Sequence, residues 1–186
     1  LVLTHYDYDH ISGAAELMDR LRVKRLLMPD CQDDAGLRQW AEEEAETHGT
    51  AVELVTRTRT GPLGGGILTV YPSAADGGDN DSGLAVLCSA GTFDLLITGD
   101  MSRRAEKAFL EAYPLPDIEV LAVGHHGSRG STGEELLDAL RPEVGMVSVG
   151  RNRYGHPAEE TLRRLTAAGV AVCRTDRQGD IHITVK

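Results

Sequence analysis

The stretch that decides the fold opens the chain as Leu1-Val2-Leu3-Thr4-His5-Tyr6-Asp7-Tyr8-Asp9-His10. Its apolar start is typical of a buried strand, and residues 13–21 that follow have a helical pattern. The polar residues therefore lie where a strand gives way to a helix, and side chains can converge there because the backbone stops being regular. Imidazole nitrogens and carboxylate oxygens are ordinary protein ligands of divalent metal ions. The stretch predicts a metal site made by His5, Asp7, Asp9 and His10.

Beyond this stretch, short apolar runs alternate with helical patterns, which predicts an α/β fold with helices packed on sheets. Ser131 and Glu134 fit a capping box at a helix start. The Gly-rich segments 61–66 and 74–83 are interpreted as loops. We expect helices over about 13–21, 33–47, 103–112, 133–140 and 158–168. The expected strands cover 1–4, 24–28, 51–55, 67–71, 84–89, 93–98, 119–123, 144–149, 171–174 and 181–185.

The composition indicates one folded, acidic domain. The chain has 186 residues, of which 41% are hydrophobic, and its formal net charge is −10. Because no internal repeat marks a second unit, we expect residues 1–186 to form a single domain, truncated at its N-terminus since it begins inside a strand pattern. The acidity argues against broad electrostatic capture of nucleic acid, which depends on Lys and Arg, but leaves room for a local basic path.

Further motifs occur in the order found in one known family. His5 to His10 reads H-x-D-x-D-H, Asn80-Asp81-Ser82 precedes a strand, and Leu96-Ile97-Thr98-Gly99-Asp100 ends another. The segments 123–128, 148–157 and 174–179 continue the match, the first with the string Gly-His-His-Gly-Ser. In these motifs the chain resembles the metallo-β-lactamase superfamily, most closely the C-terminal domain of the ComEC competence proteins. The resemblance implies a four-layer αββα sandwich with metals at one edge, here without the first strands of the family's domain.

The resemblance also implies a role for each ligand. His5 and Asp7 would hold one metal ion, and Asp9 and His10 a second, with Asp100 bridging both. His126 is assigned to the second metal, and His125 is assigned as a proton donor or charge stabiliser beside the substrate phosphate. The opposite assignment of these two histidines stays open. Asp9 is expected to orient the attacking water as well, so Asp9 and His125 are the catalytic candidates.

Two departures from the broad superfamily bear on the metal. Asp7 stands where many members have a histidine, and no histidine lies between His48 and His125, so the usual ligand from mid-chain is missing. The harder oxygen ligands favour Mn²⁺, with Zn²⁺ or Mg²⁺ possible, and up to two ions per chain. Asn80 and Ser82 lie near the place of the missing ligand, where they would support a phosphate or a water, or only cap a loop.

On the substrate side, the resemblance implies contacts from the later motifs. His156 is expected at the edge of the site, although a residue that only flanks a helix is the alternative. Ser128 and Ser131 are expected to donate hydrogen bonds to phosphate, although Ser131 as a helix cap alone is an equal alternative, and Asn152 belongs to the same group. The candidates for local contacts with a nucleic-acid backbone are Arg103, Arg104, Arg129, Arg151 and Arg153.

The expected function is that of a metal-dependent phosphodiesterase, the nuclease domain of a ComEC-like DNA-uptake protein that hydrolyses DNA with water activated by metal. A phosphodiesterase of small molecules is one alternative. A non-catalytic, metal-stabilised module that binds DNA or docks on a channel is another. The expected partners are DNA, single-stranded in this setting, and the membrane channel domain of the parent protein; no organic cofactor is expected. The chain would then be a soluble domain of a bacterial membrane protein.

Overall fold

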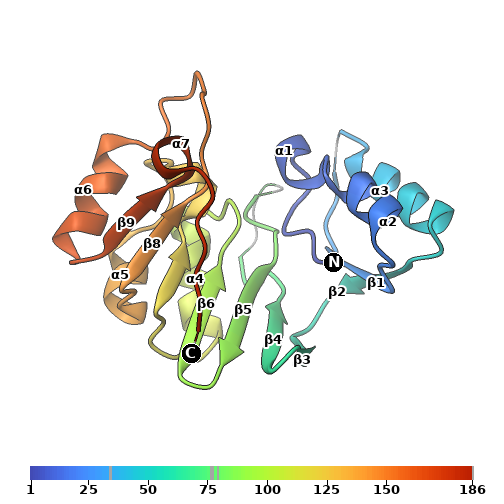
Figure 1. Cartoon of the computed structure of the whole chain (residues 1–186), viewed down its shortest axis with the longest axis horizontal. Helices are drawn as coiled ribbons and strands as arrows, with labels where there is room; N and C mark the ends of the chain where they lie inside the picture. Colours follow the sequence, from blue (N-terminus) through green and yellow to red (C-terminus); the bar gives the residue numbers. More distant parts are fainter. Residues whose placement is uncertain (34, 76–77, 79, 186) are drawn as a thin grey trace.

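A large mixed sheet forms the centre of the molecule (Figure 1). The computed structural model describes residues 1–33, 35–75, 78 and 80–185. Within these, seven strands pair in chain order, antiparallel from the first to the fourth and parallel from there to the last. The strands are β3 (Arg59–Leu63), β4 (Gly66–Tyr71), β5 (Ala85–Ala90), β6 (Phe93–Ile97), β7 (Val120–Ala122), β8 (Val144–Val147) and β9 (Ala171–Arg174).

Three helices cover one face of this sheet, because parallel strands need crossovers that pack back on it. They are α4 (Arg103–Ala112), α5 (Glu134–Leu140) and α6 (Glu159–Ala167). Their apolar sides meet the sheet in the largest core, where Phe109, Leu140 and Leu165 are fully or almost fully buried. Leu96 and Leu121 supply the sheet's side of that core.

A second, smaller sheet lies on the opposite face of the large one. It consists of the parallel strands β1 (Arg25–Pro29) and β2 (Ala51–Val55). A small core of Val55, Val70 and Leu84 joins the two sheets. The outer side of the small sheet packs against α1 (Tyr8–Ile11), α2 (Ala14–Arg20) and α3 (Leu37–Thr47). The layers thus run helix, sheet, sheet, helix, as expected.

The structure corrects several predicted elements. Residues 1–4 are not a strand and pair through a single bridge between Val2 and Leu27, and 181–185 are not a strand either. Residues 61–63, interpreted as part of a loop, belong to β3, which turns into β4 at Gly64 with its φ of +57°. The predicted loop 74–83 lies partly outside the described residues.

The capping box at Ser131 and Glu134 is also wrong. Gly133 is the N-cap of α5 and makes no side-chain cap, while the Ser131 hydroxyl donates to the carbonyl of Met101 at 2.7 Å. Two short helical segments that the sequence did not predict follow β7 and β9. They are η1 (Gly124–Gly127) and α7 (Thr175–Gln178). Across the described residues, no helix combines the length and apolar character of a membrane span.

Candidate metal centre and substrate pocket

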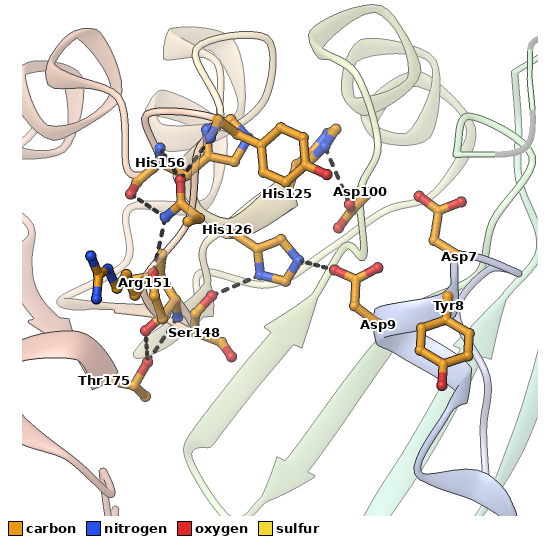
Figure 2. A pocket seen from close by; sticks show the side chains of 14 residues that line it. Asp7, Tyr8, Asp9, Asp100, His125, His126, Ser148, Arg151, His156 and Thr175 are labelled. Atoms are coloured by element: carbon orange, nitrogen blue, oxygen red, sulfur yellow. Dashed lines mark hydrogen bonds and ion pairs between the residues drawn. The ribbon is translucent and has the colours of Figure 1, made fainter.

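The predicted metal ligands meet at one end of the large sheet. Asp100 follows β6, and His125 and His126 follow β7, so the carboxyl ends of two neighbouring parallel strands present them side by side. The segment from His5 through α1 supplies the other ligands from the second half of the sandwich (Figure 2). Residues far apart in the sequence therefore converge because the two sheets pack face to face.

Asp100 lies at the centre of this group and is 5% exposed. Its Oδ1 is 3.3 Å from Nε2 of His10, and its Oδ2 is 3.7 Å from Nε2 of His5 and 3.5 Å from Nε2 of His125. Burial opposes ionisation of Asp100, but the hydrogen bond from His10 and the neighbouring imidazoles lower its pKa. Each carboxylate oxygen faces a different histidine, which is the arrangement that a bridging ligand requires.

His5 fits a metal ligand because one of its ring nitrogens is buried without a partner. The side chain is 1% exposed, Nδ1 lies 3.0 Å from the Thr4 hydroxyl, and Nε2 has no hydrogen-bond partner among the described residues. Burial, aided by the charge of His10, lowers the pKa of His5 to about 4. His5 is therefore neutral at pH 7, and its Nε2 lies 3.7 Å from a carboxylate oxygen of Asp7 and 3.7 Å from one of Asp100. An unsatisfied buried nitrogen is costly unless something binds it.

A second group of donors forms around His126. Its Nε2 lies 3.2 Å from Asp9 Oδ2 and 3.2 Å from His10 Nε2. Its Nδ1 lies 2.7 Å from the carbonyl of Ser148, to which it donates, so Nε2 keeps its lone pair. Histidines that bind metals commonly have this tautomer, fixed by a carbonyl on the other nitrogen. Both groups, His5 with His10 and Asp100, and Asp9 with His10 and His126, thus place three possible ligand atoms within 4.8 Å of one another.

The histidine pair is held in an unusual backbone conformation. His125 and His126 have φ values of +49° and +52°, in the left-handed region that residues other than glycine seldom adopt. The N–H of His125 donates to the carbonyl of Gly99 at 3.1 Å, which ties the pair to the strand end that carries Asp100. This turn is why two adjacent side chains reach the same site.

Glu106 supports the loop that follows the histidines. It lies in α4, is 1% exposed, and accepts hydrogen bonds from the backbone N–H groups of Thr132 and Gly133 at 2.5 and 2.8 Å. Burial raises its pKa, although these two bonds counteract the effect. Arg164 reinforces the loop by donating to the carbonyls of Ser131 and Thr132 at 2.8 and 3.0 Å. No sequence pattern indicated this support.

We expect Glu106→Ala to destabilise the protein by about 3 kcal/mol, because it leaves two buried N–H groups unsatisfied at ~1–3 kcal/mol each. Denaturant unfolding measures this change. The matched control is Glu111→Ala, an exposed residue in the same helix, which should change the free energy of unfolding by less than about 0.5 kcal/mol. Equal stability of the two variants would contradict the supporting role of Glu106.

An open pocket of about 660 Å³ lies over the donor groups (Figure 2). The segment between β8 and α6 forms its far side and includes Arg151, Asn152 and His156. A neighbouring hollow of about 510 Å³ shares His125, Tyr154 and His156 with it and includes Ser128 and Arg129. The residues that line the first pocket are Asp7, Tyr8, Asp9, Asp100, His125, His126, Ser148, Val149, Gly150, Arg151, Asn152, Tyr154, His156 and Thr175.

The structure places some of the predicted substrate contacts away from the pocket. Ser131 is 1% exposed, so it cannot reach a phosphate in the pocket. Asn80 and Ser82 do not line the pocket; their loop packs on Thr4 and His5 instead. Asn152 does line it, yet its side chain mainly holds its own loop, with bonds to the backbone of Tyr154 and His156.

His156 lies at the pocket edge, with its ring centroid 5.6 Å from that of His125. Burial and the two histidines of η1 lower the pKa of His156. Of the arginines, Arg151 and Arg129 line the two hollows, whereas Arg103 and Arg104 line a different one. Sequence reasoning missed Tyr8 and Tyr154 as pocket residues, because exposure of a tyrosine has no sequence signature.

Comparison with known proteins places this geometry in context. Residues 1–151 match the sequence profile of the metallo-β-lactamase superfamily. The chain is 34% identical to "ComE operon protein 3" of Bacillus subtilis over all of its own length, and 28% identical to "Competence protein ComA" of Neisseria gonorrhoeae over 98% of it. The chain spans 24% of the length of each of these relatives.

A solved structure has the same fold. The metallo-β-lactamase fold protein YhfI of Bacillus subtilis superimposes with a TM-score of 0.56 over 94% of this chain and 73% of that one. The sequence identity is 15%, so this likeness concerns the fold alone.

Proposed function

Because this chain belongs to the metallo-β-lactamase superfamily and is related to competence proteins, we propose that it is a metal-dependent phosphodiesterase that cleaves DNA during DNA uptake. The observation that carries the proposal is the convergence of His5, His10 and Asp100, and of Asp9, His10 and His126, beneath an open pocket. A metal ion with a purely structural role is surrounded by protein ligands, whereas a catalytic metal site keeps a position open to water or substrate, as this pocket would allow. The unpartnered Nε2 of buried His5 supports the same reading.

Divalent ions in these two donor groups would activate water and neutralise the charge of a phosphodiester. Asp100 would serve both ions, since its two oxygens face His5 and His10 separately. Asp9 faces His126 on the solvent side of the site, where it would orient the attacking water. His125 lines the pocket and carries the proton that the leaving oxygen takes. His156, beside it, contacts the phosphate or the adjoining sugar.

The geometry adds one feature to this assignment. His125 faces the same oxygen of Asp100 as His5 does, whereas His126 lies in the group of Asp9 and His10. This supports His126 as a ligand, and it leaves His125 near enough to the first group to complete it. Metal analysis of a His125 variant distinguishes proton donation from ligation.

We expect Mn²⁺ to support faster turnover than Zn²⁺. Three of the six proposed ligands are carboxylates (Asp7, Asp9 and Asp100), and oxygen ligands prefer harder ions. The measurement is the cleavage rate of chelator-treated protein after each metal is added back in equal stoichiometric amounts. Equal or faster turnover with Zn²⁺ would contradict this preference.

The test of the function is cleavage of labelled single-stranded DNA, in parallel with bis-p-nitrophenyl phosphate. The proposal expects turnover of both that a chelator abolishes and Mn²⁺ restores. Turnover of the small diester alone would identify a small-molecule phosphodiesterase. Metal and DNA binding without cleavage of either would identify a non-catalytic module.

A further inference from the structure

The aromatic side chains of this protein are distributed in an unexpected way. The chain has one Trp, five Tyr and two Phe. Tyr6, Tyr71 and Phe109 are buried, and Trp40, Phe93 and Tyr113 are partly buried. Among the described residues, the exposed aromatic side chains are Tyr8, at 72%, and Tyr154, at 84%. Both line the pocket over the metal centre.

The two tyrosines come from different halves of the sandwich. Tyr8 is the first residue of α1, and Figure 2 shows it across the pocket from His156. Tyr154 lies in the segment between β8 and α6, with its ring stacked on His156 at 6.0 Å between centroids and 24° between planes. Tyr154 and His156 also border the second hollow, which leads on past Ser128 and Arg129. An aromatic ring therefore stands on each side of the site where a phosphate would be cleaved.

Because the protein is acidic, aromatic rings would give it a way to bind nucleic acid that does not depend on charge. With a net charge of −10 and three carboxylates in the pocket, the protein gains little from attraction of a polyanion. Stacking of a nucleobase on an aromatic ring does not depend on charge and tolerates any base. Arg151 and Arg129 give a backbone local contacts on the side of Tyr154.

We propose that Tyr8 and Tyr154 are stacking subsites for nucleobases on the two sides of the scissile phosphate, so that the site takes single-stranded nucleic acid. This inference rests on the proposed function and names the substrate class of the same pocket. A duplex is disfavoured because its bases are already stacked on one another. Binding should accordingly depend on bases more than on salt.

The experiment compares a short oligothymidylate with an abasic strand of the same length and charge. Affinities are measured by fluorescence anisotropy with chelator present, and kcat and KM with Mn²⁺. Wild type should bind the oligothymidylate more tightly than the abasic strand. Each of Tyr8→Ala and Tyr154→Ala should reduce the affinity for the oligothymidylate about tenfold, the scale of one stacked base, and should leave the affinity for the abasic strand unchanged.

The control variants isolate the ring. Tyr8→Phe and Tyr154→Phe keep the ring and should retain the preference for the oligothymidylate over the abasic strand. In the Ala variants, the weaker binding should appear as a higher KM, with kcat unchanged. Ile67→Ala, at a 51% exposed position on β4, should change neither the affinity for the two strands nor the kinetic constants. The metal content of Tyr8→Ala should equal that of wild type, which separates stacking from damage to α1.

The outcomes separate this inference from the proposed function. Wild type that binds both strands equally, or binds neither, overturns the stacking subsites even if it cleaves DNA. Base-dependent binding that the Ala variants lose, without cleavage of any strand, refutes the hydrolase and leaves the subsites in place. A uniform loss of affinity for both strands in the Ala variants would also overturn them, since it would indicate a structural effect.

Discussion

Asp100→Asn is expected to lose at least about 10³-fold in phosphodiester turnover and to bind metal with reduced stoichiometry. The substitution preserves shape but removes the charge that faces His5, His10 and His125 within 3.7 Å. It also replaces one carboxylate oxygen of Asp100 with an amide N–H₂ group. That group is a hydrogen-bond donor, so only one side of the side chain can still accept a hydrogen bond or bind a metal ion. Metal analysis and cleavage of labelled single-stranded DNA measure the two effects.

The matched control is Asp117→Asn, which removes an equal charge from an exposed ion pair with Arg141. It should keep wild-type metal content and turnover. If Asp100→Asn retained full metal content and turnover, Asp100 would not be a bridging ligand, and the assignment of the group of His5, His10 and Asp100 would fall with it.

His125→Asn is expected to keep near-wild-type metal content while turnover falls by ~10²–10⁴-fold, the usual range for loss of a general acid or base. Asn is the appropriate replacement because it tolerates the left-handed conformation of this residue, with φ at +49°. The remaining activity should be least for substrates with poor leaving groups, since these need the proton most. Bis-p-nitrophenyl phosphate, with its good leaving group, should therefore be affected less than DNA.

His182→Asn, at an exposed position near the C-terminus, serves as the control and should leave turnover unchanged. Loss of metal from His125→Asn would make His125 a ligand of the group of His5 and Asp100, as its 3.5 Å approach to Asp100 allows. Unchanged turnover on both substrates would remove His125 from the mechanism.

Much of the fold follows from local pattern. The alternation of apolar runs and helical segments predicted β4 through β9 and helices α4 to α6 to within a few residues, because each of these elements buries a continuous apolar face. The errors lie where burial is partial. Residues 1–4 look like a strand but form a single β-bridge, and β3, with exposed Leu63 and a glycine and proline, lacks a strand pattern.

For the site, the residue types of the adjacent stretch from His5 to His10 indicated metal ligands, and the resemblance to the metallo-β-lactamase superfamily added Asp100 and His126. What the chain could not reveal by itself is which side chains meet. His10 and His126 are separated by 116 positions, and only the packing of one sheet on the other brings their Nε2 atoms within 3.2 Å.

Burial was equally a property of the tertiary structure. The sequence suggests that Ser131 donates a hydrogen bond to phosphate, but in the structure its side chain is buried and donates to the carbonyl of Met101. Tyr8 and Tyr154 have no special sequence pattern, and only the structure places both in the pocket. The sequence by itself determined the α/β class and the donor cluster from His5 to His10, since these depend on short-range periodicity and residue type, and the order of the later motifs carried the family resemblance. The tertiary structure decided the tautomer of His126, the orphaned nitrogen of His5 and the exposed rings, since each depends on atoms contributed by distant segments.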